Sequence, residues 1–533
     1  MATIDLKTIT CKRPFRRVVT RLGVIRHPFY ENNEPANVEE SNLFVPVTQA
    51  DFLEEYYPGG HRIYDTTYFP DIWRQVSEPK YSETGEPIIG EDGQELRENK
   101  VYCERVPRYA FAFQQIIAMA HITHATGNDV QHELAEPDPS EATEKLFDAM
   151  CSDWIRCGME RAWYESYKSR EITGDAAFVG FMDEKHNFSW RVFSYQKGDR
   201  LYPHYDQYGK LEYFVRATNQ YDENEQSVAE TLEVWDDTYM YVYRKNTGSA
   251  RTVVDKARAL FGASEYTLVS PPKTHGFPCI PVAYVRDDDG PGWSPSQDQI
   301  DCYELSFSQM AHNNQAYGEA ILVLKSRSEI PIGITRDLGG TVKQIDLQDP
   351  EDEASYLEGQ SASESYLKQL ETLEDGIYRS SNAVKVPDEL RSGDTPASAI
   401  KLLFANALNQ AAADGMECEG FINDVWLIFA CAYGLKNSCL VTAMNLPVHS
   451  WIKPFVHLSE SAVTADLVAL KNADIISAQT AAERASFYSK PGEARRIREE
   501  KKAMQDIDLL YEREQLKAQS ALRNTGASNE TGE

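Results

Sequence analysis

Residues 294–412 constrain the fold of this chain more than any other stretch, because three helical patterns follow one another there. The first helix is expected over 296–317, since Ser294-Pro295-Ser296-Gln297 has the form of a capping box with proline at the first helical position. The second is expected over 362–383, and the third begins at Asp394-Thr395-Pro396. The order predicts two paired helices, a short loop and then a long helix.

Apolar residues recur at helical spacing in the first two patterns, so one face of each helix is expected to pack against a partner. These residues are Ile300, Tyr303, Phe307 and Met310 in the first helix and Tyr366, Leu370, Leu373 and Ile377 in the second. Between the two helices, residues 320–324 and 330–334 are short apolar runs of β type, and a proline interrupts the second run. The paired helices are therefore expected to be joined by a small insertion that contains strands.

The chain is strongly acidic, with a formal net charge of −29 over 533 residues. Its length suffices for roughly two to four domains. The charge argues against wrapping nucleic acid by neutralising phosphates, which requires clustered lysine and arginine. An acidic wall does suit a surface along which DNA slides without sticking. On charge alone, an acidic protein with no such role is the simpler interpretation.

Cysteine usage and hydropathy indicate the cellular compartment in which the protein is expected. The nine cysteines include no Cys-x-x-Cys pair and their total is odd, which favours reduced thiols in a cytoplasm over a disulfide framework. No apolar run is long enough for a membrane span, so no membrane contact is expected. Basic residues between Lys12 and Arg26 form an N-terminal arm, which we expect to be a solvated tail rather than an arm that reaches a neighbouring subunit.

Residues 141–243 change from a helical to a β pattern. One long amphipathic helix is expected over 141–170. Aromatic and β-branched residues then predict strands at 176–182, 188–193, 213–217 and 239–243. The acidic residues Asp222, Glu223, Glu225, Glu230 and Glu233 are expected to lie in a loop between the last two strands.

Enzymatic chemistry has few candidates. His121 and His124 fall on one face of a helix, and a helical histidine pair can bind zinc, but the His-Glu-x-x-His pattern is absent. Adjacent acidic residues such as Asp236-Asp237 and Glu374-Asp375 could supply general acid–base or Mg²⁺-binding groups. In so acidic a chain, such pairs are expected by chance. No nucleophile elbow, phosphate-binding loop or dinucleotide fingerprint occurs. We therefore expect no catalytic residues, no metal and no cofactor, and an acidic intracellular metal-dependent hydrolase is the weaker alternative.

The order of elements resembles the portal proteins of tailed bacteriophages, the head-to-tail connectors of long-tailed phages in particular. Residues 275–282 suggest a short strand leading into the first stem helix. The segment 392–401 is loosely similar to the Ser-Gly-x-Ala helix start of many portals, and 472–480 with the charged run 493–502 matches the helical crown. The resemblance covers roughly residues 150–510.

The resemblance implies an α+β portal-like fold, with an α/β wing, a helical stem, a small α/β clip and a helical crown, assembled as a ring. The expected boundaries are the N-terminal region and wing at 1–295, first stem helix 296–317, clip 318–361, second stem helix 362–383, tunnel loop 384–395, long wing-to-crown helix 396–435, crown 436–519 and disordered tail 520–533.

The same resemblance implies a structural role. A homo-oligomer, expected to be a dodecamer, would occupy one capsid vertex of the virion after assembly in the host cytoplasm. Double-stranded DNA would pass through its channel during packaging and ejection. The expected partners are the terminase large subunit, a head-completion or adaptor protein, and the major capsid and scaffolding proteins. Another ring-forming head-tail adaptor is the alternative of the same class.

Site residues follow from the resemblance. The stem stripes would be buried between subunits, and Glu304, Glu364, Glu371 and Glu374 would be available to line the channel or the exterior. The clip residues expected to dock partner proteins are Asp346, Asp349, Glu351, Asp352 and Glu353. The tunnel loop near DNA comprises Val384, Lys385, Val386, Pro387, Asp388, Glu389, Leu390 and Arg391, of which the two cations are expected to approach phosphates.

Overall fold

The computed structural model describes residues 10, 12–18, 44–82, 88–90, 96–136, 139–185, 187–221, 226–247, 266–317, 321–325, 353–357, 363–385, 402–456, 460–473, 501–502 and 513–517. The chain forms two compact units. Unit 1 comprises Met1–Lys385 and Ala405–Phe455, and unit 2 comprises Val386–Phe404 and Val456–Glu533. Helices and sheets both occur, which confirms the predicted α+β class. Among the described residues, no helix is long and apolar enough to cross a membrane.

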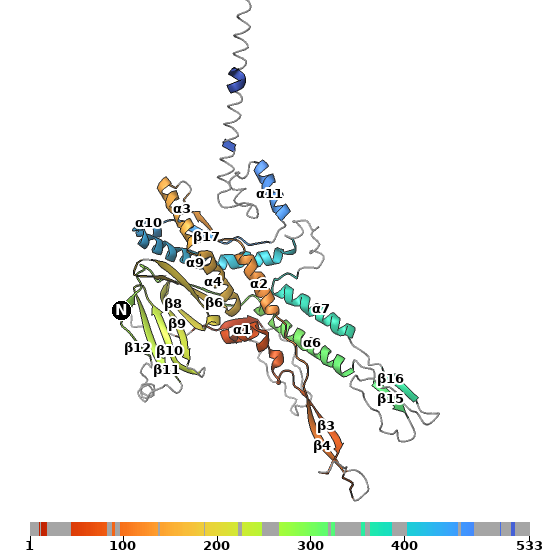
Figure 1. Ribbon diagram of the computed structural model, residues 1–533. Coiled ribbons are helices and arrows are strands. Elements are labelled where there is room, and N and C mark those ends of the chain that lie inside the picture. The colour runs from red at the N-terminus through yellow and green to blue at the C-terminus, as the bar shows by residue number, and fades with distance from the viewer. Residues whose placement is uncertain are drawn as a thin grey trace, which may run out of the picture. The chain divides into compact units, whose positions relative to one another are not determined.

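The body of unit 1 packs helices against a three-stranded antiparallel sheet of order β14-β6-β7 (Figure 1). Its helices are α2 (Phe113–Thr126), α3 (Glu141–Arg156), α4 (Met159–Thr173), α9 (Ala405–Lys436) and α10 (Leu440–Met444). Its strands are β6 (Asp175–Met182), β7 (Phe188–Phe193) and β14 (Val282–Arg286), with β5 (Gln131–Leu134) paired to β17 (Val448–Trp451) nearby. Large aromatic residues contribute to this core, with Trp154 and Phe429 meeting edge to face at 5.4 Å between ring centroids.

The long helix predicted over 141–170 is wrong, because two helices occupy that stretch. Gly158 adopts a left-handed backbone, with φ at 69°, between the end of α3 and the start of α4. Such a conformation suits glycine and interrupts a continuous right-handed helix. The strands predicted at 176–182 and 188–193 are confirmed as β6 and β7.

A second, six-stranded antiparallel sheet has the order β12-β11-β10-β9-β8, with β13 also paired to β11. Its strands are β8 (Asp199–Tyr205), β9 (Leu211–Tyr221), β10 (Ser227–Trp235), β11 (Tyr239–Asn246), β12 (Thr267–Leu268) and β13 (Lys273–Thr274). The predicted loop is wrong from Ser227 onward, since Glu230 and Glu233 belong to β10. These carboxylates pair at 2.8 Å with Arg200 of β8 and Arg216 of the adjacent strand β9, which makes the acidic residues compatible with a strand.

The two sheets share an apolar cluster. Phe193 and Leu201 pack there with Phe214, Trp235 and Val282, all buried. The cluster fixes the larger sheet to the body of unit 1.

The N-terminal basic segment is partly integrated into unit 1, contrary to the expected solvated tail. Strand β1 (Phe15–Val18) pairs with β2 (Phe44–Val47), which is followed by helix α1 (Gln49–Tyr56). Lys12 forms an ion pair with buried Asp175, and Arg17 contacts Glu55 at 2.8 Å. The Phe15 ring packs so closely on Gly174 that a Cβ there would come within 2.5 Å of it. Of the remaining predicted arm, 19–26 lies outside the described residues.

Two elongated features extend from the body in Figure 1. One is the antiparallel hairpin of β3 (Ile72–Pro79) and β4 (Arg97–Glu104). The other consists of α6 (Gln297–Tyr317) and α7 (Ser363–Ser380), with strands β15 (Ile321–Lys325) and β16 (Glu353–Leu357) in the segment that joins them. Short 3₁₀ turns lie at Pro58–Gly60, Arg62–Tyr64, Tyr195–Lys197 and Ser294–Ser296.

Unit 2 contains helix α11 (Glu460–Asn472) among its described residues. The crown is expected to begin at residue 436. Residues 436–455 belong to unit 1, where β17 pairs with β5.

Candidate functional site

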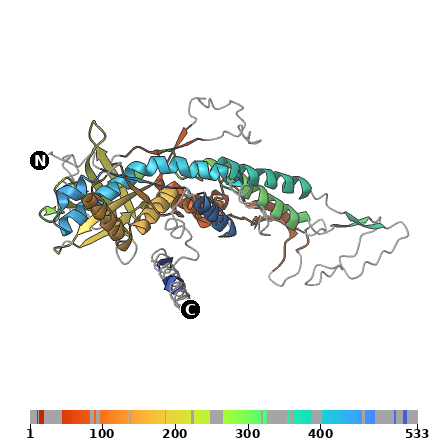
Figure 2. The same ribbon diagram turned by 90° about the horizontal axis from the view of Figure 1, so that it is seen from above.

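Helices α6 and α7 lie side by side and antiparallel, which forms what we call the stem hairpin (Figure 2). Near one end, the Ser296 hydroxyl donates to the carbonyl of Ile377 at 3.0 Å. Further along, the Gln369 amide donates to the Ser306 hydroxyl at 3.1 Å. The predicted capping box is wrong: Ser294 lies in a 3₁₀ turn before α6, and its hydroxyl accepts a hydrogen bond from Arg17.

The apolar stripes of the stem hairpin are buried to different degrees. Ile300 and Ile377 are fully buried within this chain, in a cluster with Phe113 and Trp293, and Leu370 is buried as well. They therefore have little or no surface left for another subunit, contrary to the expected burial between subunits. N-terminal segments complete this packing through Phe15 and Phe52, which no local pattern predicts. Half-buried stripe residues are Tyr303, Phe307, Met310, Tyr366 and Leu373.

Phe307 also has partners in its own chain. Its ring contacts those of Tyr109 and Phe111 edge to face, at 5.3 and 5.0 Å between centroids. Glu304 is fully buried, which corrects its assignment to the channel or the exterior. Its carboxylate lies 2.6 Å from His61 Nδ1 and accepts the Phe111 backbone N–H at 2.8 Å.

The outer side of α7 carries the exposed carboxylates. Glu364 and Glu371 are exposed there; Glu371 pairs with Lys368 and Glu374 with Lys385, each at 2.9 Å. Helix α6 contains three carboxylates and no lysine or arginine, and α7 contains four carboxylates against one lysine and one arginine. The stem hairpin is therefore acidic.

Parts of the predicted clip and tunnel loop lie within the described residues. In the clip, β15 pairs antiparallel with β16, and Glu353 lies opposite Lys325. Val384 is half-buried and Lys385 is exposed. Outside the described residues are 330–334, Asp346, Asp349, Glu351, Asp352, Val386, Pro387, Asp388, Glu389, Leu390 and Arg391.

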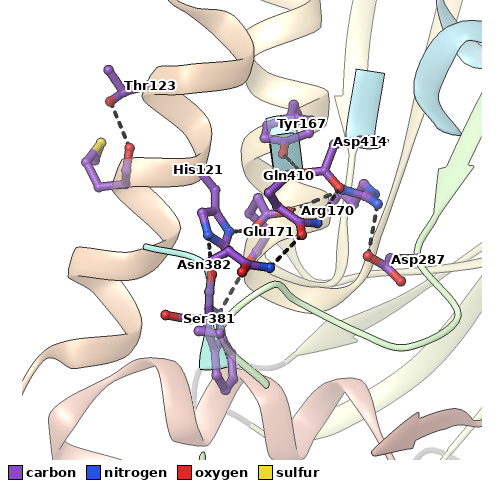
Figure 3. Close-up of polar contacts among 12 residues, drawn as sticks. His121, Thr123, Tyr167, Arg170, Glu171, Asp287, Ser381, Asn382, Gln410 and Asp414 are labelled. Carbon is purple, nitrogen blue, oxygen red and sulfur yellow. Dashed lines mark hydrogen bonds and ion pairs between the residues drawn. The ribbon is translucent and has the colours of Figure 1, made fainter. Parts of the chain in front are cut away.

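A buried polar network lies where α7 ends, and Figure 3 shows its members. Arg170 of α4, 1% exposed, is its centre. Its guanidinium contacts four carboxylates, Glu171 at 3.2 Å, Asp287 at 2.9 Å, Asp414 at 3.6 Å and Glu417 at 2.7 Å. One arginine thereby joins α4, α9 and the turn after β14.

The network continues to the chain just beyond α7. Asp414 accepts hydrogen bonds from the Tyr167 hydroxyl at 2.6 Å and from the Gln410 amide at 3.2 Å. The Asn382 amide in turn donates to the Gln410 side-chain oxygen at 3.0 Å (Figure 3). Asn382 has φ at 54°, a left-handed conformation that asparagine tolerates better than most residues. A side-chain hydrogen bond thus joins residues 382 and 410, which lie on either side of the segment 386–404 in the chain.

Electrostatic effects in the network oppose one another. Burial would lower the pKa of His121, but its contact with Glu171 raises the pKa above the ordinary value. Burial likewise opposes ionisation of Glu171, yet the hydrogen bond from His121 keeps its pKa low. Burial raises the pKa of Asp287 to about 7 although Arg170 lies beside it. Both shifts favour the charged forms of His121 and Glu171.

This arrangement holds α4, α9 and the segment after α7 together. Among the described residues, no group of three metal-ligating side chains could hold a metal ion. The sequence drew attention to His121, but Arg170, Asn382, Gln410 and Asp414 were missed. No local pattern identifies them, because their partners lie up to 247 positions away in the chain.

Comparison with known proteins gives the family. No curated protein matches the chain. Residues 123–506 match the family described as phage portal protein, SPP1 Gp6-like, and this range includes the stem hairpin, α9 and the members of the network other than His121. The match extends over more than half of the chain, which therefore belongs to the phage portal protein family.

Proposed function

We propose that this portal protein assembles as a ring of about twelve copies at one capsid vertex, and that double-stranded DNA passes through the ring during packaging and ejection. Family membership supports the proposal. The acidic stem hairpin, with no lysine or arginine on α6 and exposed carboxylates on α7, supports the channel. Like charge keeps a polyanion from binding to the wall, so DNA would slide.

The clip, 318–361, is proposed as the docking platform for the terminase large subunit and later for a head-completion or adaptor protein. Its described part is the ribbon of β15 and β16, in the segment that joins the two stem helices. The acidic sequence from Asp346 to Glu353 would attract basic partner surfaces. Such attraction acts chiefly on the association rate and on its salt dependence. The major capsid and scaffolding proteins are the further partners proposed, at the capsid vertex.

The tunnel loop is proposed at 384–391, with Lys385 and Arg391 making brief contacts with phosphates. Lys385 has Glu374 as its partner on α7. A half-exposed pair of this kind is weak, so the lysine can leave it for a phosphate. Replacing both cations with alanine is expected to change packaging or retention of DNA while leaving ring assembly intact.

The observation that carries the proposal is the antiparallel stem hairpin with its strand-containing connection, located within the family match. Native mass spectrometry and electron microscopy of the purified protein test it. Closed rings of about twelve copies are expected. A protein that stays monomeric at micromolar concentration, or a ring whose density places 384–391 away from the axis, contradicts the assembly or the loop assignment respectively.

A further inference from the structure

We propose that α2 is a shared anchor: the His121 and His124 side chains position the two segments by which the chain leaves unit 1, residues 381–385 and 453–455. The chain passes from Lys385 to Val386 and from Phe455 to Val456 into unit 2. The inference concerns contacts within unit 1 of a single chain, so it stands or falls independently of the proposed channel.

The first anchor holds the segment after α7. His121 Nε2 donates to the carbonyl oxygen of Ser381 at 2.8 Å, and Nδ1 lies 3.3 Å from the Glu171 carboxylate (Figure 3). Both side chains are buried. The backbone of Gly292 closes the other side of the ring, because a Cβ there would come within 2.4 Å of Nδ1. The imidazole therefore has a fixed orientation.

The second anchor lies one helical turn further along α2. His124 Nδ1 donates to the carbonyl oxygen of Phe455 at 2.8 Å, and the Phe455 N–H donates back to the His124 carbonyl at 2.7 Å. The Asn128 amide contacts the carbonyl oxygens of Lys453 at 2.9 Å and Pro454 at 3.1 Å. A Cβ on Gly127 would come within 2.4 Å of the Phe455 ring, so glycine permits this close approach.

Both histidines bind backbone carbonyls, which fixes the path of each segment whatever its side chains are. Helix α2 is itself held firmly, because Ile117, Ile122 and Ala125 are almost fully buried in the body of unit 1. Residues three apart lie on the same side of a helix, so one rigid surface serves both segments. The role that follows for His121 and His124 is to position these segments by hydrogen bonds rather than to fill space.

Hydrogen exchange on the full-length protein tests this role, using replacements that retain or remove each donor. A glutamine amide can reproduce the Nε2 donor of His121, and an asparagine amide can reproduce the Nδ1 donor of His124. His121→Leu and His124→Leu fill similar space without a donor. We expect His121→Leu to speed exchange in 381–385, and His124→Leu to speed exchange at 453–455, by about ten-fold each. His121→Gln and His124→Asn should restore most of the protection.

The control is Thr123→Val, which removes a hydrogen bond to Met119 within the same helix and touches neither segment. Exchange at both segments should stay at the wild-type rate in this variant. Two results overturn the proposal. One is equal protection in the leucine and amide variants, which would assign the histidines to packing. The other is faster exchange spread evenly into β9 and β10, which would indicate general destabilisation.

Discussion

At the scale of single residues, Arg170 is the side chain whose loss should cost most. Arg170→Leu would leave the carboxylates of Glu171, Asp287 and Asp414 close together without their cation. Breaking a buried ion pair from one side typically costs about 3–5 kcal/mol. Denaturant unfolding followed by fluorescence should show a loss of that size. Arg161→Leu, on the same helix at an exposed pair with Glu165, should cost less than about 1 kcal/mol. Equal losses in both variants would contradict a central role for Arg170.

The same network should make stability depend on pH. Burial raises the pKa of Asp287 to about 7, and Glu171 raises that of His121 despite burial. Both groups bind their protons more tightly when folded, so their contributions are present at low pH and are lost as pH rises through these folded pKa values. The pKa of Glu171 is lowered, so this group stabilises the fold above its unfolded pKa, and that stabilisation is lost on acidification. Arg170, Asp414 and Glu417 complete the charges of the network.

The melting temperature should therefore fall as pH is raised from about 5 to about 7, because aspartate in the unfolded chain has a pKa of about 3.9 and folded Asp287 one of about 7. Melting curves of the wild type and of Asp287→Asn across this range provide the measurement. The asparagine variant cannot ionise at this position, so its melting temperature should change less with pH. A wild type and variant with parallel profiles would show that Asp287 does not titrate in this range.

Single residues also show where sequence reasoning ends. The spacing of His121 and His124 marked them as a pair on one helix face, and the structure does place them on α2. Their acceptors, the backbone carbonyls of Ser381 and Phe455, are 260 and 331 positions away. A backbone carbonyl leaves no trace in residue type, so no motif search could have predicted these contacts.

At the scale of secondary-structure elements, the break between α3 and α4 gives a quantitative prediction. A Cβ on Gly158 would meet no atom within 4 Å, so Gly158→Ala tests backbone strain alone. With φ at 69°, alanine is expected to destabilise the fold by about 1 kcal/mol. Gly420→Ala is the matched control: its Cβ also meets nothing, but it lies inside α9, where alanine should stabilise by about 0.5–1 kcal/mol. Denaturant midpoints of the two variants should move in opposite directions.

Elements with strong periodicity were predicted, and elements that depend on distant partners were missed. Strands β6 and β7 follow from their β-branched and aromatic residues, whatever packs on them. Strand β10 lies where the sequence predicts a loop that contains Glu230 and Glu233. Their partners Arg200 and Arg216 belong to β8 and β9, and only the paired sheet brings them together. The helix break at Gly158 was missed because the apolar spacing continues across it.

At the scale of the whole molecule, the acidic outer side of α7 connects composition with the proposed channel. The net charge of −29 says nothing about where the charge lies. On α7 the exposed carboxylates Glu364, Glu371 and Asp375 are concentrated on a helix whose opposite side packs against α6. If copies of this helix border the channel, its carboxylates face passing DNA, and their sign decides whether the wall repels or binds phosphates.

Replacing Glu364, Glu371 and Asp375 together with lysine should therefore turn a repelling wall into a binding one. Purified rings of the variant are expected to bind double-stranded DNA at low salt, with affinity falling steeply as salt rises, because bound phosphates displace counterions. Packaging should slow or stall while ring assembly continues. The matched control reverses Glu141, Glu144 and Asp148, three exposed carboxylates on α3, and changes the net charge equally. Packaging that fails equally in both variants would point to overall charge, and normal packaging in the α7 variant would place this side of the helix away from the DNA.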